Sequence, residues 1–254
     1  MLRSLPPFPP VAAKLMNMLR QEDANLDDAI ELMKNDASMA MELLRLANSA
    51  AAGARFPITT MLQALSVLGV NRIVSLATTL CVSRLLKPVT NLPVMRRCWR
   101  HNLATAMIAH SRARQHDLDP EKAYTFGLLA GIGRLALVVL NPQLYTHLVS
   151  RAEAERMPVD IFEKELFGFD HREAGNWLVR EWKLPEELST VVFSFSSPPV
   201  GQEADLSFLI RDASSEADNM GFGVLEFKDA DRMLNPMYLE IAECVNQVEQ
   251  ELNV

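Results

Sequence analysis

Apolar residues recur at intervals of three and four positions along most of the chain, the spacing that places them on one face of an α-helix. Nowhere does the sequence sustain the alternation of apolar and polar residues that is typical of β-strands. The pattern therefore predicts an all-α fold. The predicted helices cover residues 11–19, 25–33, 38–48, 60–69, 73–86, 95–116, 123–140, 142–155, 158–166, 170–182, 185–195, 203–220 and 236–252.

Two pairs of residues mark where helices begin. Thr60 with Gln63, and Asp170 with Glu173, have the spacing of a capping box, in which each side chain accepts a hydrogen bond from the backbone N–H of the other residue. Gly69 is a stop signal for the first of these helices, because glycine readily adopts the left-handed conformation that ends a helix. We therefore expect helices to begin directly after Thr60 and Asp170.

Residues 87–93, with the sequence KPVTNLP, interrupt the helical pattern with two prolines and several turn-forming residues. Most of the helices predicted beyond this segment are longer than most of those before it. At 254 residues the chain is long enough for one large hydrophobic core or two modest ones. We therefore predict a smaller N-terminal helical part over residues 1–90, and a larger helical core with a C-terminal helix over residues 91–254.

The chain is acidic, with 25 lysines and arginines against 32 aspartates and glutamates and a formal net charge of −7. Proteins bind nucleic acids mainly through surplus positive charge, so no nucleic-acid partner is expected. The three cysteines, Cys81, Cys98 and Cys244, are odd in number and widely spaced, which fits neither a disulfide framework nor a zinc site. We expect them to be reduced thiols in the core.

The first ten residues contain four prolines and one arginine but no apolar run that ends at a small-residue cleavage site, so we expect no signal peptide and a cytoplasmic location. Residues 123–140 test this expectation, because they are apolar apart from Tyr124, Thr125 and Arg134. An arginine inside a membrane span costs about 2.5 to 3.5 kcal/mol. We therefore expect a helix buried in a protein core, and no membrane association.

Four stretches, in order along the chain, carry a family resemblance. They are LPPFP at residues 5–9, LRLANS at 44–49, GLLAGIGRL at 127–135, and FGFDHREAG at 167–175, which is followed by WKLP at 182–185. Together they resemble the HDOD family, whose members are relatives of the HD and HD-GYP metal-dependent phosphohydrolases. The resemblance implies an HD-like helical core preceded by a smaller N-terminal helical part, and a role in bacterial signal transduction. HDOD domains generally lack the complete catalytic set.

The resemblance also implies that the metal site of the HD hydrolases is degenerate in this chain. In those enzymes several His and Asp side chains converge on divalent ions, which polarise a phosphate and generate hydroxide. His101 and His171 stand where two of the family's histidines lie, but Ala130 and Gly131 replace the central His-Asp pair. Ser214 corresponds to a late aspartate, for which Asp212 or Asp218 could substitute if the register shifts. Two histidines cannot form a three-ligand catalytic site. We therefore expect no catalytic residue, metal or cofactor, with His101 and His171 as vestigial metal candidates.

Four residues are candidate contacts for a ligand or a partner: Arg45, Asn48, Arg134 and Arg172. Arg45 and Asn48 could equally form hydrogen bonds at a helix end. Arg134 could instead lie along apolar surface or pair with an acid. Arg172, with His171 before it, lies in the first turn of a predicted helix, where free backbone N–H groups attract anions.

Gly127 and Gly131 are four residues apart on a predicted helix, a spacing that lets another backbone approach closely. A phosphate-binding loop is the alternative, because Gly131 and Gly133 enclose a single residue. No strand is predicted before them, which such a loop requires, so the packing role is favoured.

These features predict a non-catalytic regulatory domain that acts through protein–protein contacts in bacterial signalling. The expected partners are proteins of a signalling pathway, such as cyclic-dinucleotide or phosphorelay proteins. Two alternatives stay open. One is a metal-dependent phosphohydrolase with a rearranged ligand set drawn from His101, His171, Asp170 and Asp212. The other is a nucleotide-sensing domain that does not hydrolyse its ligand.

Overall fold

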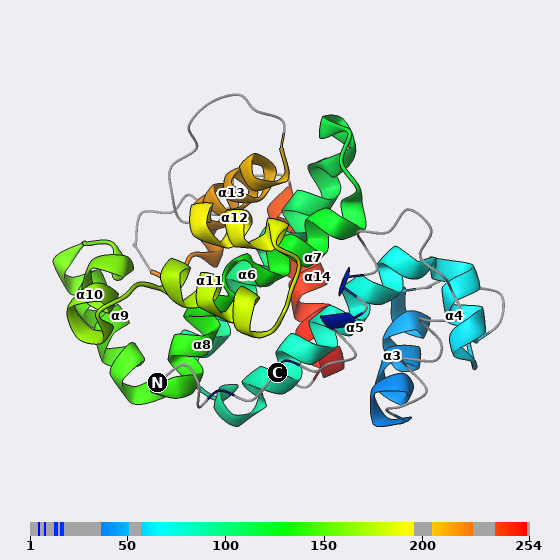
Figure 1. The fold of residues 1–254 in the computed structure, drawn as a ribbon, viewed down its shortest axis with the longest axis horizontal. Coiled ribbons are helices and arrows are strands. Elements are labelled where there is room, and N and C mark those ends of the chain that lie inside the picture. Colours follow the sequence, from blue (N-terminus) through cyan, green and yellow to red (C-terminus); the bar gives the residue numbers. More distant parts are fainter. Residues whose placement is uncertain are drawn as a thin grey trace. The chain divides into compact units, whose positions relative to one another are not determined.

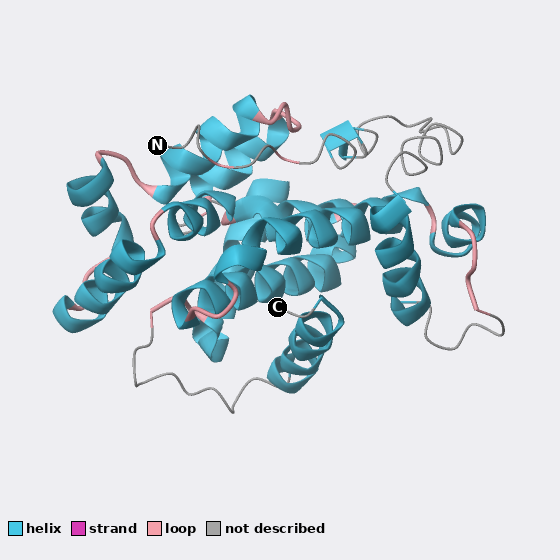
Figure 2. Ribbon diagram, turned by 90° about the horizontal axis from the view of Figure 1, so that it is seen from below, coloured by secondary structure: helices cyan, strands magenta, loops and turns pink. Residues whose placement is uncertain are grey.

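The computed structural model describes residues 5, 8, 13, 14, 16, 17, 37–50, 57–195, 205–225 and 237–252. Every regular element in these ranges is a helix, which confirms the all-α prediction (Figure 2). The predicted helix at 25–33 lies outside the described residues. The elements are α3 Ala37–Ala50, α4 Met61–Leu68, α5 Val70–Leu86, η2 Lys87–Val89, α6 Pro93–Ala113, η3 Arg114–His116, α7 Pro120–Ala130, α8 Ile132–Leu140, α9 Pro142–Glu155, α10 Val159–Phe167, α11 His171–Glu181, α12 Glu187–Ser194, α13 Leu206–Ala217, the π-helical turn η4 Asp218–Phe222, and α14 Met237–Leu252 (Figure 1).

The chain forms two compact units. The smaller unit is Pro7–Leu85, and it contains α3, α4 and nearly all of α5. The larger unit consists of Met1–Pro6 and Leu86–Val254, and it contains every element from η2 onward.

In the smaller unit, α3 packs against α4. Helix α4 begins with the predicted capping box. The Gln63 N–H donates to Thr60 Oγ1 at 3.2 Å, and the Thr60 N–H donates to Gln63 Oε1 at 3.2 Å. The helix ends at Gly69, whose φ of 80° lies in the left-handed region. Both boundary predictions for this helix are confirmed.

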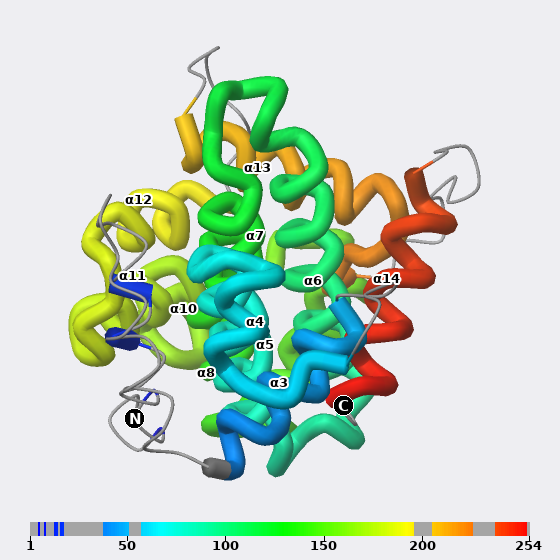
Figure 3. Tube along the Cα trace, turned by 90° about the vertical axis from the view of Figure 1, so that its right-hand side faces the viewer, coloured from blue at the N-terminus to red at the C-terminus, as the bar shows by residue number. Residues whose placement is uncertain are grey.

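Helix α6 is the central element of the larger unit. Residues on both of its sides are buried, among them Trp99, Leu103 and Ile108. Helices α7, α13 and α14 pack along it, and α8 also contacts it (Figure 3). Helix α11 packs against α8 on one side and α12 on the other. This arrangement brings side chains from α6, α8 and α11 toward one another.

The helix predicted over residues 123–140 is not continuous. It breaks at Gly131, which lies between α7 and α8 with φ −91° and ψ 17°. The cause is Asn102 of α6, whose amide Nδ2 donates to the Leu128 carbonyl at 3.0 Å and whose side chain occupies the space where a Cβ of residue 131 would lie. A Cβ at Gly127 would lie 2.9 Å from the Ala106 Cα. Both glycines therefore serve close packing against α6.

Residues 120–140 are long and apolar enough to cross a membrane, but 89% of their most apolar window is buried inside the protein. This matches the expected helix in a protein core. Helices α4 and α5 pass the same test only as a pair, and they are bent by 116° at the break between them.

One expectation about the cysteines is wrong. Cys81 and Cys98 are buried, but Cys244 is exposed on α14. The apolar pattern turns Cys244 inward, whereas the structure turns Ile241, Val245 and Glu249 inward. Because Glu249 is one of the buried residues, the buried face of α14 cannot be identified from the spacing of apolar residues alone.

Candidate functional site

His101 and His171 contribute to one buried polar cluster in the larger unit. His101 comes from the middle of α6 and His171 from the first position of α11, and their exposed fractions are 2% and 3%. Arg134 of α8 influences the ionisation of both histidines, and Glu163 of α10 influences that of His171. We refer to His101, Arg134, Glu163 and His171 as the central cluster.

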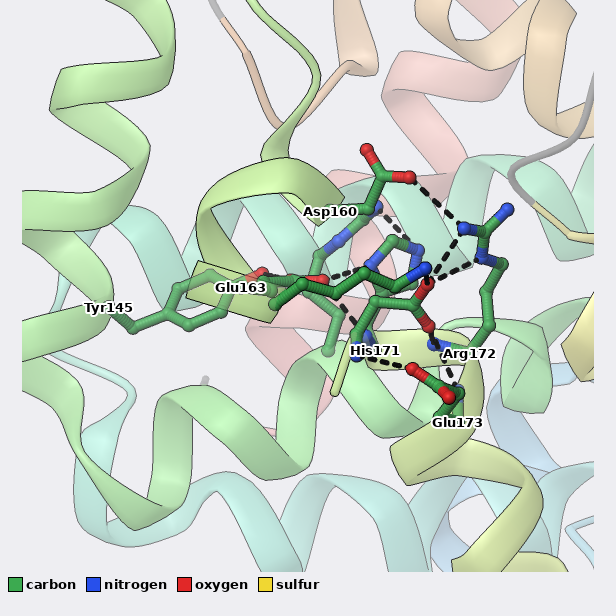
Figure 4. Close-up of polar contacts among 9 residues, drawn as sticks. Tyr145, Asp160, Glu163, His171, Arg172 and Glu173 are labelled. Carbon is green, nitrogen blue, oxygen red and sulfur yellow. Dashed lines mark hydrogen bonds and ion pairs between the residues drawn. The ribbon is translucent and has the colours of Figure 1, made fainter. Parts of the chain in front are cut away.

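His171 uses both ring nitrogens within this cluster. Its Nδ1 lies 2.6 Å from Glu163 Oε2, and its backbone N–H donates to the same oxygen at 2.8 Å (Figure 4). On the other side of the ring, Nε2 lies 3.1 Å from Nη2 of Arg134. The backbone N–H of His171, in the first turn of α11, is thus already bonded to the Glu163 carboxylate and does not face an external anion.

These partners define the protonation state of His171. A carboxylate only accepts and a guanidinium only donates, so Nδ1 carries the proton and Nε2 accepts from Arg134. Burial, together with the positive charge of Arg134, lowers the pKa of His171 despite the nearby Glu163. The ring is therefore neutral at pH 7, and its only lone pair is directed at a guanidinium.

Glu163 bonds to both His171 and Tyr145, and it is not among the site residues predicted from the sequence. It is fully buried, and Tyr145 of α9 donates its hydroxyl to Oε1 at 2.5 Å. Burial alone would raise the pKa of Glu163. The interactions with His171, Arg134 and Tyr145 outweigh this effect, so the pKa is lowered and the carboxylate is charged. The residue spacing could have indicated that Glu163 is buried, because Glu163 shares one face of α10 with the apolar residues Val159 and Phe162.

His101 lies against α13 and η4. Its Nε2 is 3.2 Å from the Ser214 Oγ, and its Nδ1 is 3.4 Å from Asp218 Oδ1. The ring also packs edge-on against Phe195, with centroids 5.7 Å apart. Burial lowers the pKa of His101, and Arg134 adds to this effect, although Asp218 opposes it. His101 is therefore a neutral core histidine at pH 7.

Ala130 and Gly131 lie where α7 ends, and neither has a side-chain atom that could bind a metal ion. Both are buried, with Gly131 pressed against Asn102. No group of three or more His, Cys, Asp or Glu side chains in the described ranges is placed to hold a metal ion. Of the two vestigial candidates, His171 already accepts from Arg134. The described residues therefore do not fit the divalent ion that HD hydrolases require.

Two aspartates of the rearranged ligand set have other partners. Asp170 caps α11, accepting from the N–H groups of Arg172 at 2.9 Å and Glu173 at 3.0 Å, and this confirms the predicted capping box. Although burial opposes it, hydrogen bonds from Arg172 and its neighbours hold the pKa of Asp170 well below its usual range. Asp212 pairs with Arg112 at 2.9 Å. The structure does not bring these two carboxylates to the histidines as a ligand set.

Arg172 pairs within its own part of the fold. Its Nη2 lies 2.7 Å from Asp170 Oδ2 and 3.0 Å from Asp160 Oδ2. The pKa of Arg172 is raised, first by its hydrogen bond to Asp170. These contacts fix the loop between α10 and α11, so the structure gives Arg172 a structural role.

Arg45 and Asn48 belong to the smaller unit. Arg45 is exposed on α3. Asn48 pins the segment before α4 to α3, because its Oδ1 accepts from the Ile58 N–H at 2.7 Å and its Nδ2 donates to the Ile58 carbonyl at 2.8 Å. A second bond from Nδ2 reaches the Leu44 carbonyl at 2.8 Å. Both the oxygen and the nitrogen of the Asn48 amide are thus hydrogen-bonded to backbone groups.

Replacing Asn48 by aspartate should destabilise the smaller unit by about 1 to 3 kcal/mol, because the carboxylate keeps the acceptor but faces the Ile58 and Leu44 carbonyls without a donor. The urea midpoint of the full chain measures this loss. Asn91→Asp, at an exposed turn position, is the matched control and should change the midpoint little. Equal midpoints for the two variants would contradict the role of Asn48.

Comparison with known proteins adds a family to this geometry. The family model of the HDOD domain matches residues 5–198. A protein of unassigned function from Treponema pallidum is 21% identical over 202 residues, which are 78% of this chain and 39% of that protein. The chain thus spans about two fifths of the length of that curated relative. Helices α13 and α14 lie beyond the matched range, although α13 supplies the Ser214 contact to His101.

Solved structures share the fold. An HDOD domain protein with unknown function from Geobacter sulfurreducens has a TM-score of 0.77 at 22% identity, covering 98% of this chain and 89% of that one. A protein named as a candidate phosphohydrolase from Shewanella amazonensis has a TM-score of 0.70 at 23% identity, covering 100% and 87%. A candidate signal transduction protein from Marinobacter aquaeolei has a TM-score of 0.73 at 21% identity, covering 99% and 60%. At these identities the likeness extends to the fold alone.

Proposed function

The chain belongs to the HDOD family, and from this membership we propose that it is a regulatory domain that acts by binding another protein and has no phosphohydrolase activity. The observation that carries the proposal is Arg134. Its guanidinium bonds to Nε2 of His171, a vestigial metal-ligand candidate, so this nitrogen is directed at a cation of the protein. We infer that the arginine takes the place of the metal ion of an HD hydrolase.

Electrostatics favour this exchange of cations. Arginine stays charged at every relevant pH. Burial alone would lower the pKa of Arg134, but Tyr145, Glu163 and other neighbours raise it above its ordinary value. A divalent ion about 4 Å from this guanidinium would be repelled by about 8 kcal/mol at an effective dielectric constant of about 20.

The protein-binding part of the proposal is supported by the family and by a structural relative. Members of the HDOD family work in bacterial signalling, and a structural relative from Marinobacter aquaeolei is named as a candidate signal transduction protein. The partners proposed for this chain are therefore signalling proteins, such as cyclic-dinucleotide or phosphorelay proteins.

Metal content and turnover, measured on one preparation, test the non-catalytic assignment. We expect the purified full chain to hold substoichiometric divalent metal, and to hydrolyse neither cyclic dinucleotides nor bis-p-nitrophenyl phosphate faster than buffer does. His101→Ala should leave both results unchanged, because His101 contacts Ser214 and Asp218 in the structure. Stoichiometric metal together with hydrolysis that disappears in His101→Ala would refute the proposal.

A further inference from the structure

The C-terminal helix α14 lies along α6 in the larger unit, beyond the range matched by the family model (Figure 3). Charged side chains form part of its contact with α6. Glu249 is buried with 3% of its surface exposed, and its Oε2 lies 3.1 Å from Arg96 Nη2 and 2.5 Å from Arg100 Nη1. Arg100 also donates to Asn246 Oδ1 at 2.9 Å. Two arginines of α6 thus converge on one carboxylate of α14.

The two helices are complementary in charge. Helix α14 carries four glutamates and no lysine or arginine. Arg96 and Arg100 are one helical turn apart on α6, and the Arg100 guanidinium lies 5.9 Å from the centroid of the Phe222 ring. Phe222 in turn contacts Tyr238 at the start of α14, with ring centroids 5.7 Å apart. We call the surface formed by Arg96, Arg100 and Phe222 the arginine face.

Helix α14 is weakly anchored compared with the core helices. Its buried residues are Ile241, Val245 and Glu249, whereas α6 buries residues along its whole length. A buried ion pair adds little net stability, because removing the charges from water offsets most of their attraction. Elements with few buried apolar contacts open locally more easily than the rest of a fold. Helix α14 is therefore an element of the larger unit that another helix could replace.

We propose that the arginine face is a docking site for an acidic amphipathic helix of a partner protein, and that α14 occupies it in the unbound chain. The inference rests on the proposed protein-binding function and names its surface. A matching helix has two aliphatic residues four positions apart, followed four positions later by glutamate, as Ile241, Val245 and Glu249 are arranged. Helices recognise grooves through anchors at such spacings. A partner must compete with α14, whose covalent connection gives it an effective concentration of about millimolar.

A labelled peptide with the sequence of residues 237–252 serves as the probe, and its binding to the full chain is measured by fluorescence anisotropy. We expect weak binding to the wild-type chain, because its own α14 competes. In the full chain carrying Glu249→Gln, the internal helix loses the buried carboxylate that pairs with Arg96 and Arg100, while the arginine face is unchanged, so the peptide should bind about tenfold tighter or more. The control Glu243→Gln, at an exposed position of α14, should bind as the wild type does.

Asn246→Ala is a second, milder variant that tests the proposal even if Glu249→Gln does not fold. Asn246 is exposed, so this variant loses only the hydrogen bond from Arg100. It should strengthen peptide binding in the same direction but less. Adding Arg100→Glu to Glu249→Gln should abolish the gain. Unchanged affinity in both loosened variants, or a gain that survives Arg100→Glu, overturns the proposal. So does dimerisation of the Glu249→Gln chain in sedimentation, since the occupant would then be a second copy. None of these results depends on metal or turnover, so the non-catalytic assignment can fail separately.

Discussion

Replacing Glu163 by alanine is expected to destabilise the larger unit by about 3 to 5 kcal/mol, because it leaves a buried guanidinium without its carboxylate. Glu163 accepts from Tyr145 and from two N–H groups of His171, and its charge offsets that of Arg134. All of these groups lose their partner at once. For a unit of this size the melting temperature should fall by about 6 to 20 °C.

The matched control is Glu165→Ala, two residues further along α10. The Glu165 side chain is exposed and pairs with exposed Arg151. Such surface pairs contribute at most about 1 kcal/mol. Thermal melts of the two variants and the wild type, followed by circular dichroism, give the comparison. If the Glu163→Ala and Glu165→Ala chains have the same melting temperature, the central cluster does not stabilise the fold.

The same cluster should make the protein acid-sensitive. The pKa of Glu163 is lowered in the folded state, so its contribution is present above an unfolded pKa of about 4.3 and is lost as pH falls through the folded value. The pKa of His101 is also lowered, so its contribution is lost as pH falls below about 6.5 toward the folded value. Urea midpoints measured between about pH 7 and about pH 3 should therefore fall with acid, and Glu163→Gln should flatten the lower part of that fall.

The sequence was sufficient for the helices and for their capped starts, because these depend on residues close together in the chain. The boxes at Thr60 and Asp170 need only a partner three residues away, and both are present in the structure. The break at Gly131 was missed for the opposite reason. Its cause is Asn102, which belongs to another helix and whose contact with the Leu128 carbonyl appears only when α6 and α7 pack.

The central cluster was predictable only in part. Resemblance to a family identified His101, His171 and the loss of donors at Ala130 and Gly131. It did not reveal that Glu163 and Arg134 would meet His171, because the three residues come from α10, α8 and α11. A glutamate and an arginine are common on helix surfaces, so neither stands out in a pattern of apolar positions. Only the packing of three helices turns them inward.

The crossing of α8 and α11 carries the second large prediction, which concerns Gly133. A Cβ at this position would run into the carbonyl oxygen of His171 and the backbone of Gly175. Both obstacles are backbone atoms inside or at the start of a helix, so neither can move without shifting α11. Gly133→Ala should therefore cost about 3 kcal/mol or more, at the upper end of overpacking effects.

Gly168→Ala separates this steric effect from the usual cost of replacing glycine. Gly168 has a φ of 80° but no atom within 4 Å of the position of a Cβ. Its replacement should cost only about 1 to 2 kcal/mol, the strain of a left-handed alanine. Urea unfolding of both variants gives the difference directly. A shift of α11 would also pull Nε2 of His171 from Arg134, so the pKa of His171, followed by NMR, should move toward its ordinary value in Gly133→Ala and stay in place in Gly168→Ala. Equal costs and equal pKa values for the two variants would contradict the close backbone contact on which the geometry of the central cluster depends.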